Sequence, residues 1–213
     1  RRARVPIVNP DIVDPASIKS YADLANPALK GKLCLRNRKS PYNQSLVADQ
    51  IILRGEAATA KWIRGMANNV SQEFFPKDTP QVQAVGKGKC GVAVVNTYYV
   101  GRMLAGRKGA DNRALAEKVK VVFPNPTHVN VSGAGVTASS DNPKAALKLI
   151  EFLASPNAGK GYAAANLEYP VKGFGNNPIL RSWGTFKADG VSVEQLGAKN
   201  KQAQQLMKDN GWK

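Results

Sequence analysis

Three tyrosines stand at positions where a side chain could meet a ligand. Tyr98 and Tyr99 follow the apolar run Cys90–Val95, so they fall where a buried strand ends and a helix begins. In open α/β sheets ligands bind at the carboxyl ends of the strands, which makes this pair a candidate binding site. The alternative is that these tyrosines are buried and use their hydroxyls for ordinary hydrogen bonds.

The third tyrosine, Tyr42, lies just inside a predicted helix start. Ser40-Pro41 is typical of such a start, with serine as the N-cap and proline at the first helical position. The first turn of a helix has unpaired N–H groups and the positive end of the helix dipole, and both favour an anion. The sequence therefore predicts an anion-binding position beside Tyr42.

Other kinds of chemistry have weaker support. The single histidine, His128, lies in the strand-like run Thr127–Asn130, where a lone histidine is more often structural than catalytic. One histidine and two distant cysteines do not make a zinc site. Gly86–Gly88 and Gly133–Gly135 lack the rest of a nucleotide-binding fingerprint. Because no nucleophile or acid is marked beside His128, we expect that the protein is not an enzyme.

The two cysteines allow either a disulfide or a pair of buried thiols. Cys34 and Cys90 each sit in a short apolar run that predicts a strand. Two strands of one sheet could bring them together, and a bridge would imply an oxidising compartment. The sequence leaves both interpretations open.

The charge of the chain also bears on its function. The 213 residues carry 31 Lys and Arg against 15 Asp and Glu, a net charge of +16, and 43% of them are hydrophobic. This balance is that of a folded protein of one large or two small domains, with no apolar run long enough to span a membrane. The basic residues are spread along the chain without a nucleic-acid-binding motif. We therefore expect a solvated basic surface and no nucleic-acid partner.

Strands alternate with helices along the chain, which predicts the α/β class. Apolar runs and turn residues predict extended segments at 2–8, 33–35, 90–95, 119–123 and 128–131. Helical spacing, proline starts and glycine stops predict helices within 15–29, 41–54, 57–66, 82–85, 98–104, 143–153, 159–165 and 193–207.

Several stretches resemble the bacterial ferric-iron-binding proteins that serve ABC importers, and in particular the branch that includes the cyanobacterial periplasmic iron binders. The most specific are Asn96–Tyr99 and Tyr42–Leu46, and the similarity extends in order and spacing along nearly the whole chain. The stretches are Arg2–Val5, Tyr21–Ala25, Lys30–Cys34, Tyr42–Ala48, Gly88–Ala93, Asn96–Tyr99, Thr127–Val136 and Asn166–Val171.

The resemblance implies a two-lobed periplasmic binding-protein fold of type II, with iron in the cleft between the lobes. Residues 1–8 would be a hinge strand, 9–117 the second lobe with the tyrosines, 118–125 the returning hinge strand, and 126–213 the C-terminal part of the first lobe. The relatives have a further N-terminal segment before the motif at Arg2. We therefore expect an incomplete first lobe and weakened or open-cleft metal binding if the chain stands alone.

The resemblance also implies a ligand set. The metal ligands would be Tyr42, Tyr98 and Tyr99, and a carbonate-like anion would be held by Ser40 and by Arg1 or Arg2. Fe(III) is a hard acid that prefers anionic oxygen ligands, and its charge would stabilise phenolates whose parent phenols have a pKa of about 10. Three phenolates balance a charge of +3, so reduction to Fe(II) would weaken the site.

The function implied is that of an iron(III)-binding solute receptor in the periplasm. Its partners would be an iron ion or iron chelate and an inner-membrane ABC permease, and the protein would be a monomer. Two alternatives remain: a binding protein of the same fold for a small anionic solute, which the helix start at Ser40 permits, and a basic nucleic-acid-binding protein.

Overall fold

A mixed five-stranded sheet forms the centre of the protein. The computed structural model describes the backbone of residues 1–213 and every side chain except that of residue 162. The strands are β1 (Arg2–Val8), β2 (Leu33–Cys34), β3 (Val92–Asn96), β4 (Lys120–Val121) and β5 (Val129–Asn130). β1 runs antiparallel to β3, β4 and β5, whereas β2 runs parallel to β3.

Helices lie before, between and after the strands along the chain. They are the 3-10 turns η1 (Pro15–Ser17), η2 (Tyr21–Ala25) and η3 (Pro27–Leu29), and the α-helices α1 (Pro41–Arg54), α2 (Glu56–Asn69), α3 (Asp78–Gly86), α4 (Thr97–Leu104), α5 (Ala110–Glu117), α6 (Pro143–Ala154), α7 (Pro156–Asn166), α8 (Pro178–Ser182) and α9 (Val193–Asp209). The starts predicted at Pro41 and Pro143 are confirmed, because proline needs no hydrogen-bond partner at the first helical position. The α/β class is confirmed as well.

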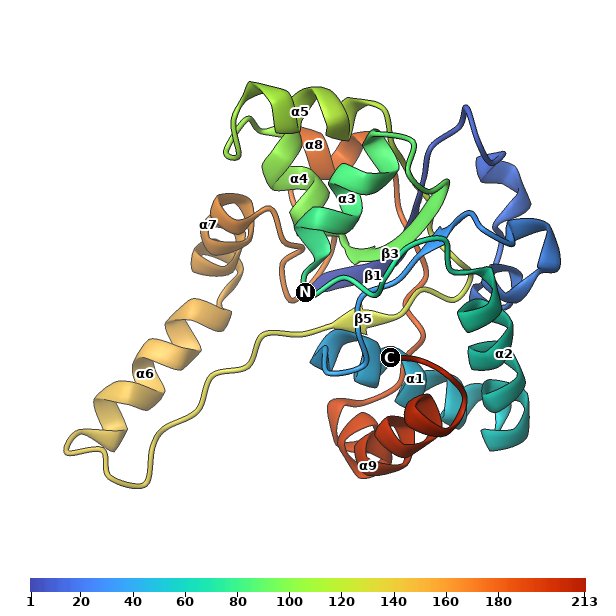
Figure 1. Ribbon diagram of the computed structural model, residues 1–213. Helices are drawn as coiled ribbons and strands as arrows, with labels where there is room; N and C mark the ends of the chain where they lie inside the picture. The colour runs from blue at the N-terminus through green and yellow to red at the C-terminus, as the bar shows by residue number, and fades with distance from the viewer.

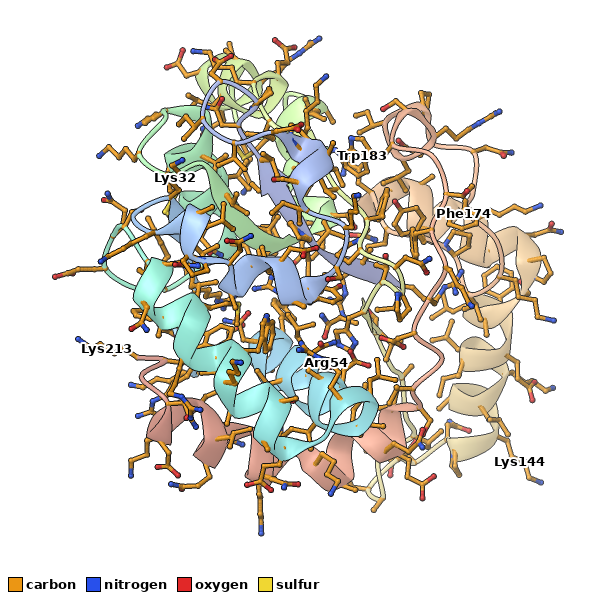
Figure 2. The ribbon with its side chains drawn as sticks, turned by 90° about the vertical axis from the view of Figure 1, so that its right-hand side faces the viewer. Lys32, Arg54, Lys144, Phe174, Trp183 and Lys213 are labelled. Carbon is orange, nitrogen blue, oxygen red and sulfur yellow. A yellow bond between two sulfur atoms is a disulfide. The ribbon has the colours of Figure 1, made fainter. Side chains whose placement is uncertain are left out.

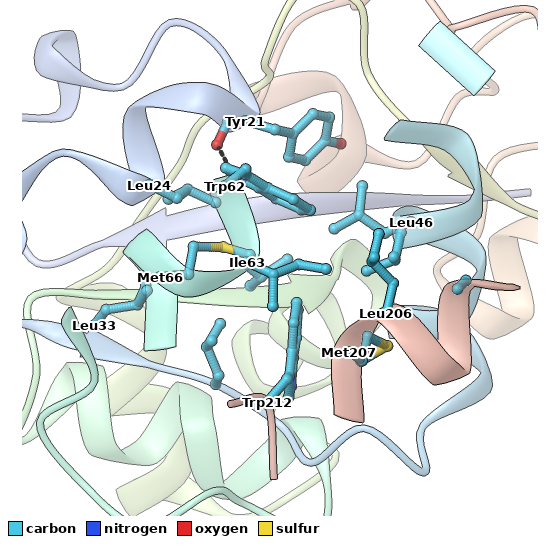
Figure 3. Packing of buried hydrophobic residues seen from close by; sticks show 14 of the residues in the cluster. Tyr21, Leu24, Leu33, Leu46, Trp62, Ile63, Met66, Leu206, Met207 and Trp212 are labelled. Carbon is cyan, nitrogen blue, oxygen red and sulfur yellow. Dashed lines mark hydrogen bonds between the residues drawn. The ribbon is translucent and has the colours of Figure 1, made fainter. Parts of the chain in front are cut away.

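Helices cover both faces of the sheet (Figure 1). On one face α1, α2 and α9 enclose an apolar core that contains Leu46, Trp62 and Met207. Figure 3 shows this core, in which the Trp62 Nε1–H group donates a hydrogen bond of 2.6 Å to the carbonyl of Tyr21. On the other face α3, α4 and α5 enclose a second core around Val82.

The alternation of side chains along β1 decides what each face of the strand contacts. Ala3 and Val5 pack with the aromatic cluster near α8, whereas the Arg4 side chain points the other way, toward the start of α1. In the register with β3, Arg4 lies opposite Asn96, the last residue of β3 and the second residue before Tyr98. The N-terminal end of β1 is therefore placed between the two predicted tyrosine sites.

One expectation about the chain path needs correction. The helical pattern at 15–29 becomes three separate 3-10 turns, because Ser20 begins a new turn in which its N–H donates to Asp23, and Pro27 begins another with Asn26 as its cap. Helix α9 packs its apolar side against α1 and α2, because the buried residues Leu206 and Met207 find their apolar partners there.

Helices α6 and α7 extend away from the sheet (Figure 1). None of the residues of α6 is buried, although its apolar side chains recur at helical spacing. Its exposed side chains include Leu149 at 58% and Phe152 at 62%. Among the described residues no helix is long and apolar enough to cross a membrane.

Candidate metal and anion site

Tyr42 is placed by the first turn of α1. The helix begins where predicted, with Ser40 as N-cap, but the Ser40 side chain makes no capping hydrogen bond. Its hydroxyl is buried and has no hydrogen-bond partner, so the polar group that usually closes a helix start is left available here. An unpaired buried hydroxyl beside a helix N-terminus is suited to donate to an anion.

Tyr98 and Tyr99 are placed by the junction of β3 and α4. The strand ends at Asn96 and the helix begins at Thr97, so the two rings project from the first turn of α4. Their centroids are 4.1 Å apart and their planes are inclined by 31°. Tyr98 is buried, whereas Tyr99 is partly exposed.

The three phenols meet although they are far apart in the sequence. Burial raises the pKa of Tyr98 above its ordinary value, and hydrogen bonding with Tyr99 and Tyr42 raises it further. Burial also raises the pKa of Tyr99, to which the charge of Asp78 contributes. Tyr98 and Tyr99 are therefore neutral phenols at neutral pH, and a cation that bound their oxygens would have to displace their protons.

Guanidinium groups surround these rings. The Arg2 Cζ atom lies 5.6 Å from the ring centroid of Tyr42 and 5.8 Å from that of Tyr98. Arg36 lies 5.3 Å from the Tyr42 ring, and Arg102 lies 4.6 Å from the Tyr98 ring. Sequence reasoning missed Arg36 and Arg102, because each approaches the site from an element whose position only the fold sets.

A buried ion pair holds the inner wall of the site. The Arg4 guanidinium, fully buried, donates to Asp78 Oδ2 at 2.5 Å and to Asn43 Oδ1 at 2.6 Å. Asp78 also accepts from Arg36 at 3.2 Å and from the backbone N–H of Asn96 at 3.0 Å. This network connects the residue after Tyr42 with the residue two before Tyr98, and thereby fixes the distance between the two tyrosine positions.

The structure distinguishes the two candidate anion-binding arginines. The Arg1 guanidinium donates to the carbonyls of Pro170 and Gly173, both at 2.9 Å. Arg2 lies over the phenol rings as described above, although its Nη2 also donates to the carbonyl of Val131 at 2.6 Å. Arg2 is therefore the member of the pair that stands at the phenols.

Cys34 and Cys90 form a disulfide. Cys34 ends β2 and Cys90 precedes β3, which are parallel neighbours in the sheet. The bridge thus joins the strand before α1 to the strand before α4, so it braces the two segments that carry the tyrosines.

His128 has neighbours that the sequence did not reveal. Its Nε2 atom is 2.8 Å from Ser45 Oγ, and its Nδ1 atom is 2.7 Å from Asp189 Oδ2. The expectation that no nucleophile or acid accompanies His128 was wrong, because residues 83 and 61 positions away fold against it. Ser45 is the fifth residue of α1, where the helix uses the backbone N–H groups internally, so its own N–H is not available as an oxyanion donor.

The family model for bacterial extracellular solute-binding proteins matches residues 2–190. The chain belongs to this family. It is a family of binding proteins and not of enzymes, as expected from the sequence. Within it the chain is similar to the iron uptake proteins and FutA/IdiA proteins of cyanobacteria, so the resemblance seen in the motifs is confirmed.

Individual relatives support this placement. Iron uptake protein A1 of Synechocystis is 41% identical over 218 residues, which cover 100% of this chain and 60% of that protein. The major ferric iron-binding protein of Neisseria meningitidis is 30% identical over 201 residues, which cover 92% and 58%. A structure of Trichodesmium FutA (IdiA) with iron and citrate superposes with a TM-score of 0.94 at 37% identity, covering 100% of this chain and 68% of that one.

The chain therefore has the α/β fold of periplasmic binding proteins but spans only 60% of the length of the first of these relatives. Lys32, Lys144 and Lys213 lie well apart from one another in the view of Figure 2, so these three lysines do not form one patch.

Proposed function

We propose that the chain is the iron(III)-binding part of a periplasmic receptor that delivers iron to an inner-membrane ABC permease. The observation that carries this proposal is the convergence of Tyr42, Tyr98 and Tyr99 among arginines. Phenolates are anionic oxygen ligands of the kind that Fe(III) prefers. Three of them would neutralise the charge of the ion, and each would give up its proton on binding.

The surrounding cations favour an anion as a companion of the metal. Arg4 and Arg36 share the single carboxylate of Asp78, and Arg2 lies 3.9 Å from the carboxylate of Glu168, whereas Arg102 has no ion pair among the described side chains. Once iron has neutralised the phenolates, this positive charge remains in the site. Carbonate or a polycarboxylate would pair with Arg2 and with the free hydroxyl of Ser40.

The same surplus of positive charge supports a second candidate, a small anionic solute bound without metal. Arg2, Arg36 and Ser40 could hold a carboxylate or phosphate with the tyrosines as neutral hydrogen-bond donors. The two candidates differ in whether the phenols lose their protons.

The lobes and the domain limits are part of the proposal. The tyrosines would lie on the wall of the second lobe, β1 and β4 would cross the hinge, and the cleft would close against a first lobe represented here by α6, α7 and their neighbours. The exposed apolar side of α6, with Leu149 and Phe152, would pack against the part of that lobe that the relatives have beyond the aligned region. The protein would bind iron as a monomer.

Titration of the metal-free chain with ferric citrate tests the proposal. Binding by phenolates should produce a visible tyrosinate-to-iron charge-transfer band and release up to about three protons per iron. The double substitution Tyr98→Phe with Tyr99→Phe should abolish the band. Tyr169→Phe is the matched control, because this buried tyrosine has no hydrogen-bond partner for its hydroxyl and makes its ring contacts with Phe174 and Phe186.

Citrate uptake without a band, or a band that survives the double substitution, would reject phenolate ligation. Binding of iron-free citrate or phosphate with no proton release would instead favour the anionic-solute candidate.

A further inference from the structure

A buried cluster of two carboxylates and one imidazole lies behind the tyrosine site. Asp189 Oδ2 is 2.7 Å from His128 Nδ1, and Asp49 Oδ1 is 3.8 Å from the same nitrogen. The three side chains are 6%, 0% and 1% exposed for Asp189, His128 and Asp49. The other ring nitrogen of His128 is hydrogen-bonded to Ser45, so the imidazole is held at both ends.

The hydrogen bonds of the cluster leave one oxygen unaccounted for. Asp49 Oδ2 accepts from Gln50 at 2.9 Å, but Asp49 Oδ1 is buried and has no partner. A buried carboxylate oxygen without a donor is costly, whereas a protonated carboxyl can itself donate to a neighbouring carboxylate. A proton on Asp49 would thus satisfy Asp49 Oδ1 and remove the repulsion from Asp189.

The electrostatics of the two acids agree with this arrangement. Burial raises the pKa of Asp49 to about 6, an effect that Asp189 reinforces and the charge of His128 opposes. Burial acts on Asp189 in the same sense, but the hydrogen bond and the charge of His128 prevail and lower its pKa. The two acids therefore differ, and Asp49 is the one that takes up a proton near neutral pH.

Tyr21 is a further ionisable group that faces the cluster. Tyr21 is buried, and Asp49 and Asp189 both help to keep its hydroxyl neutral. That hydroxyl accepts from the N–H of His128 at 2.9 Å and donates to the carbonyl of Arg4 at 2.5 Å. The N–H of Arg4 donates in turn to the carbonyl of His128 at 2.9 Å, so cluster and inner arginine share one hydrogen-bond network.

The cluster also joins three separate parts of the chain. Ser45 and Asp49 come from α1, the helix that begins beside Tyr42. His128 immediately precedes β5, which pairs with the start of β1, and Asp189 leads into α9. A change in the protonation of the cluster therefore alters how α1 is held against β1, the strand that crosses between the proposed lobes.

We propose that Asp49, His128 and Asp189 form a buried proton-binding site whose occupancy sets how firmly helix α1 is held against the paired strands β1 and β5. With the proton present, Asp49 donates to Asp189 and the three segments are tied together. When the proton leaves, two adjacent buried carboxylates repel each other, and α1 separates more readily from His128 and Asp189. The effect on iron, through the position of Tyr42, rests on the proposed function, whereas the proton site itself does not.

Carboxyl carbon resonances make the site directly observable in the metal-free protein. The side-chain carboxyl resonance of Asp49 should show a titration step near pH 6, and Asp49→Asn should remove this step because asparagine cannot ionise. The exposed Asp141 offers the control Asp141→Asn, which should leave the step unchanged. Persistence of the step in Asp49→Asn would overturn the proposal.

Hydrogen exchange supplies a second measurement. After correction for intrinsic rates, the α1 amides around Ser45 and Asp49 should open more readily as pH rises from about 4 to about 6, by up to about tenfold per pH unit, and this dependence should level off above about pH 6. In Asp49→Asn this dependence should vanish, and equal dependence in both proteins would contradict the proposal.

Two further results separate the possibilities. A shift of the His128 resonances on addition of stoichiometric Zn²⁺ or Mn²⁺ at neutral pH would overturn the proposal, because the cluster would then be a cation site. If the proton step is present and removed by Asp49→Asn but no ferric charge-transfer band forms, the proton site stands and the proposed iron function fails.

Discussion

Asp78 offers a direct test of how the inner wall of the site is held. The substitution Asp78→Asn keeps the shape of the side chain but removes its charge. Arg4 would then be a fully buried guanidinium without a carboxylate, since both partners of this pair are 0% exposed. Arg36 would also lose a partner, but its side chain is 15% exposed and can regain water.

The magnitude follows from these exposures. Removing one partner of a buried pair costs about 3–5 kcal/mol, whereas a pair that reaches solvent contributes at most about 1 kcal/mol. The loss at Arg4 therefore dominates, and we expect Asp78→Asn to lower the free energy of unfolding by about 4 kcal/mol. For a chain of this length this corresponds to a fall in Tm of roughly 8–16 °C.

Urea and thermal unfolding followed by circular dichroism measure this change. The matched control is Glu117→Gln, which removes the carboxylate of an exposed pair with Arg113 whose side chains are 59% and 53% accessible. The control should change stability by less than about 0.5 kcal/mol. If Asp78→Asn stayed within about 1 kcal/mol of this control, the buried charge of Arg4 would not depend on Asp78 and the account of the inner wall would be wrong.

Three other predictions concern the supports of the site. Ser40→Ala should change the free energy of unfolding by less than about 0.5 kcal/mol, because the Ser40 side chain makes no capping hydrogen bond; loss of a working N-cap costs about 1 kcal/mol. In the charge-transfer assay the same substitution should weaken the anion dependence of ferric binding. Reduction of the Cys34–Cys90 disulfide, which spans 56 residues, should cost about 4 kcal/mol in urea unfolding with and without reductant. Gly65→Ala should destabilise by about 1–3 kcal/mol in the same assay, because its new Cβ would lie 2.6 Å from Ala25 Cβ.

Much of the local structure could be predicted because it depends on short-range chemistry. The proline starts of α1 and α6, the buried strand β3 and the helix that follows it at Thr97 all rest on residues adjacent in the sequence. The segment 15–29 differs from its predicted single helix, because its apolar spacing is helical while the caps at Ser20 and Asn26 and the proline at Pro27 begin new turns.

The partners of His128 could not be predicted in the same way. Ser45 is a polar residue within a helix, and Asp189 lies in an irregular segment before α9. Neither carries a local pattern that marks it as a neighbour of a histidine. Their meeting depends on the packing of α1 against α9, which buries apolar side chains such as Leu206 rather than any polar motif.

The sequence by itself determined the helix start at Ser40, the strand-to-helix junction before Tyr98, the α/β class and the family, because each can be recognised from short stretches of neighbouring residues. Only the tertiary structure decided that Arg2, not Arg1, lies over the phenols, that Arg36 and Arg102 join it, and that α9 packs on α1. Strand register and apolar burial bring such residues together across long stretches of chain, and neither leaves a short-range pattern at the residues it unites.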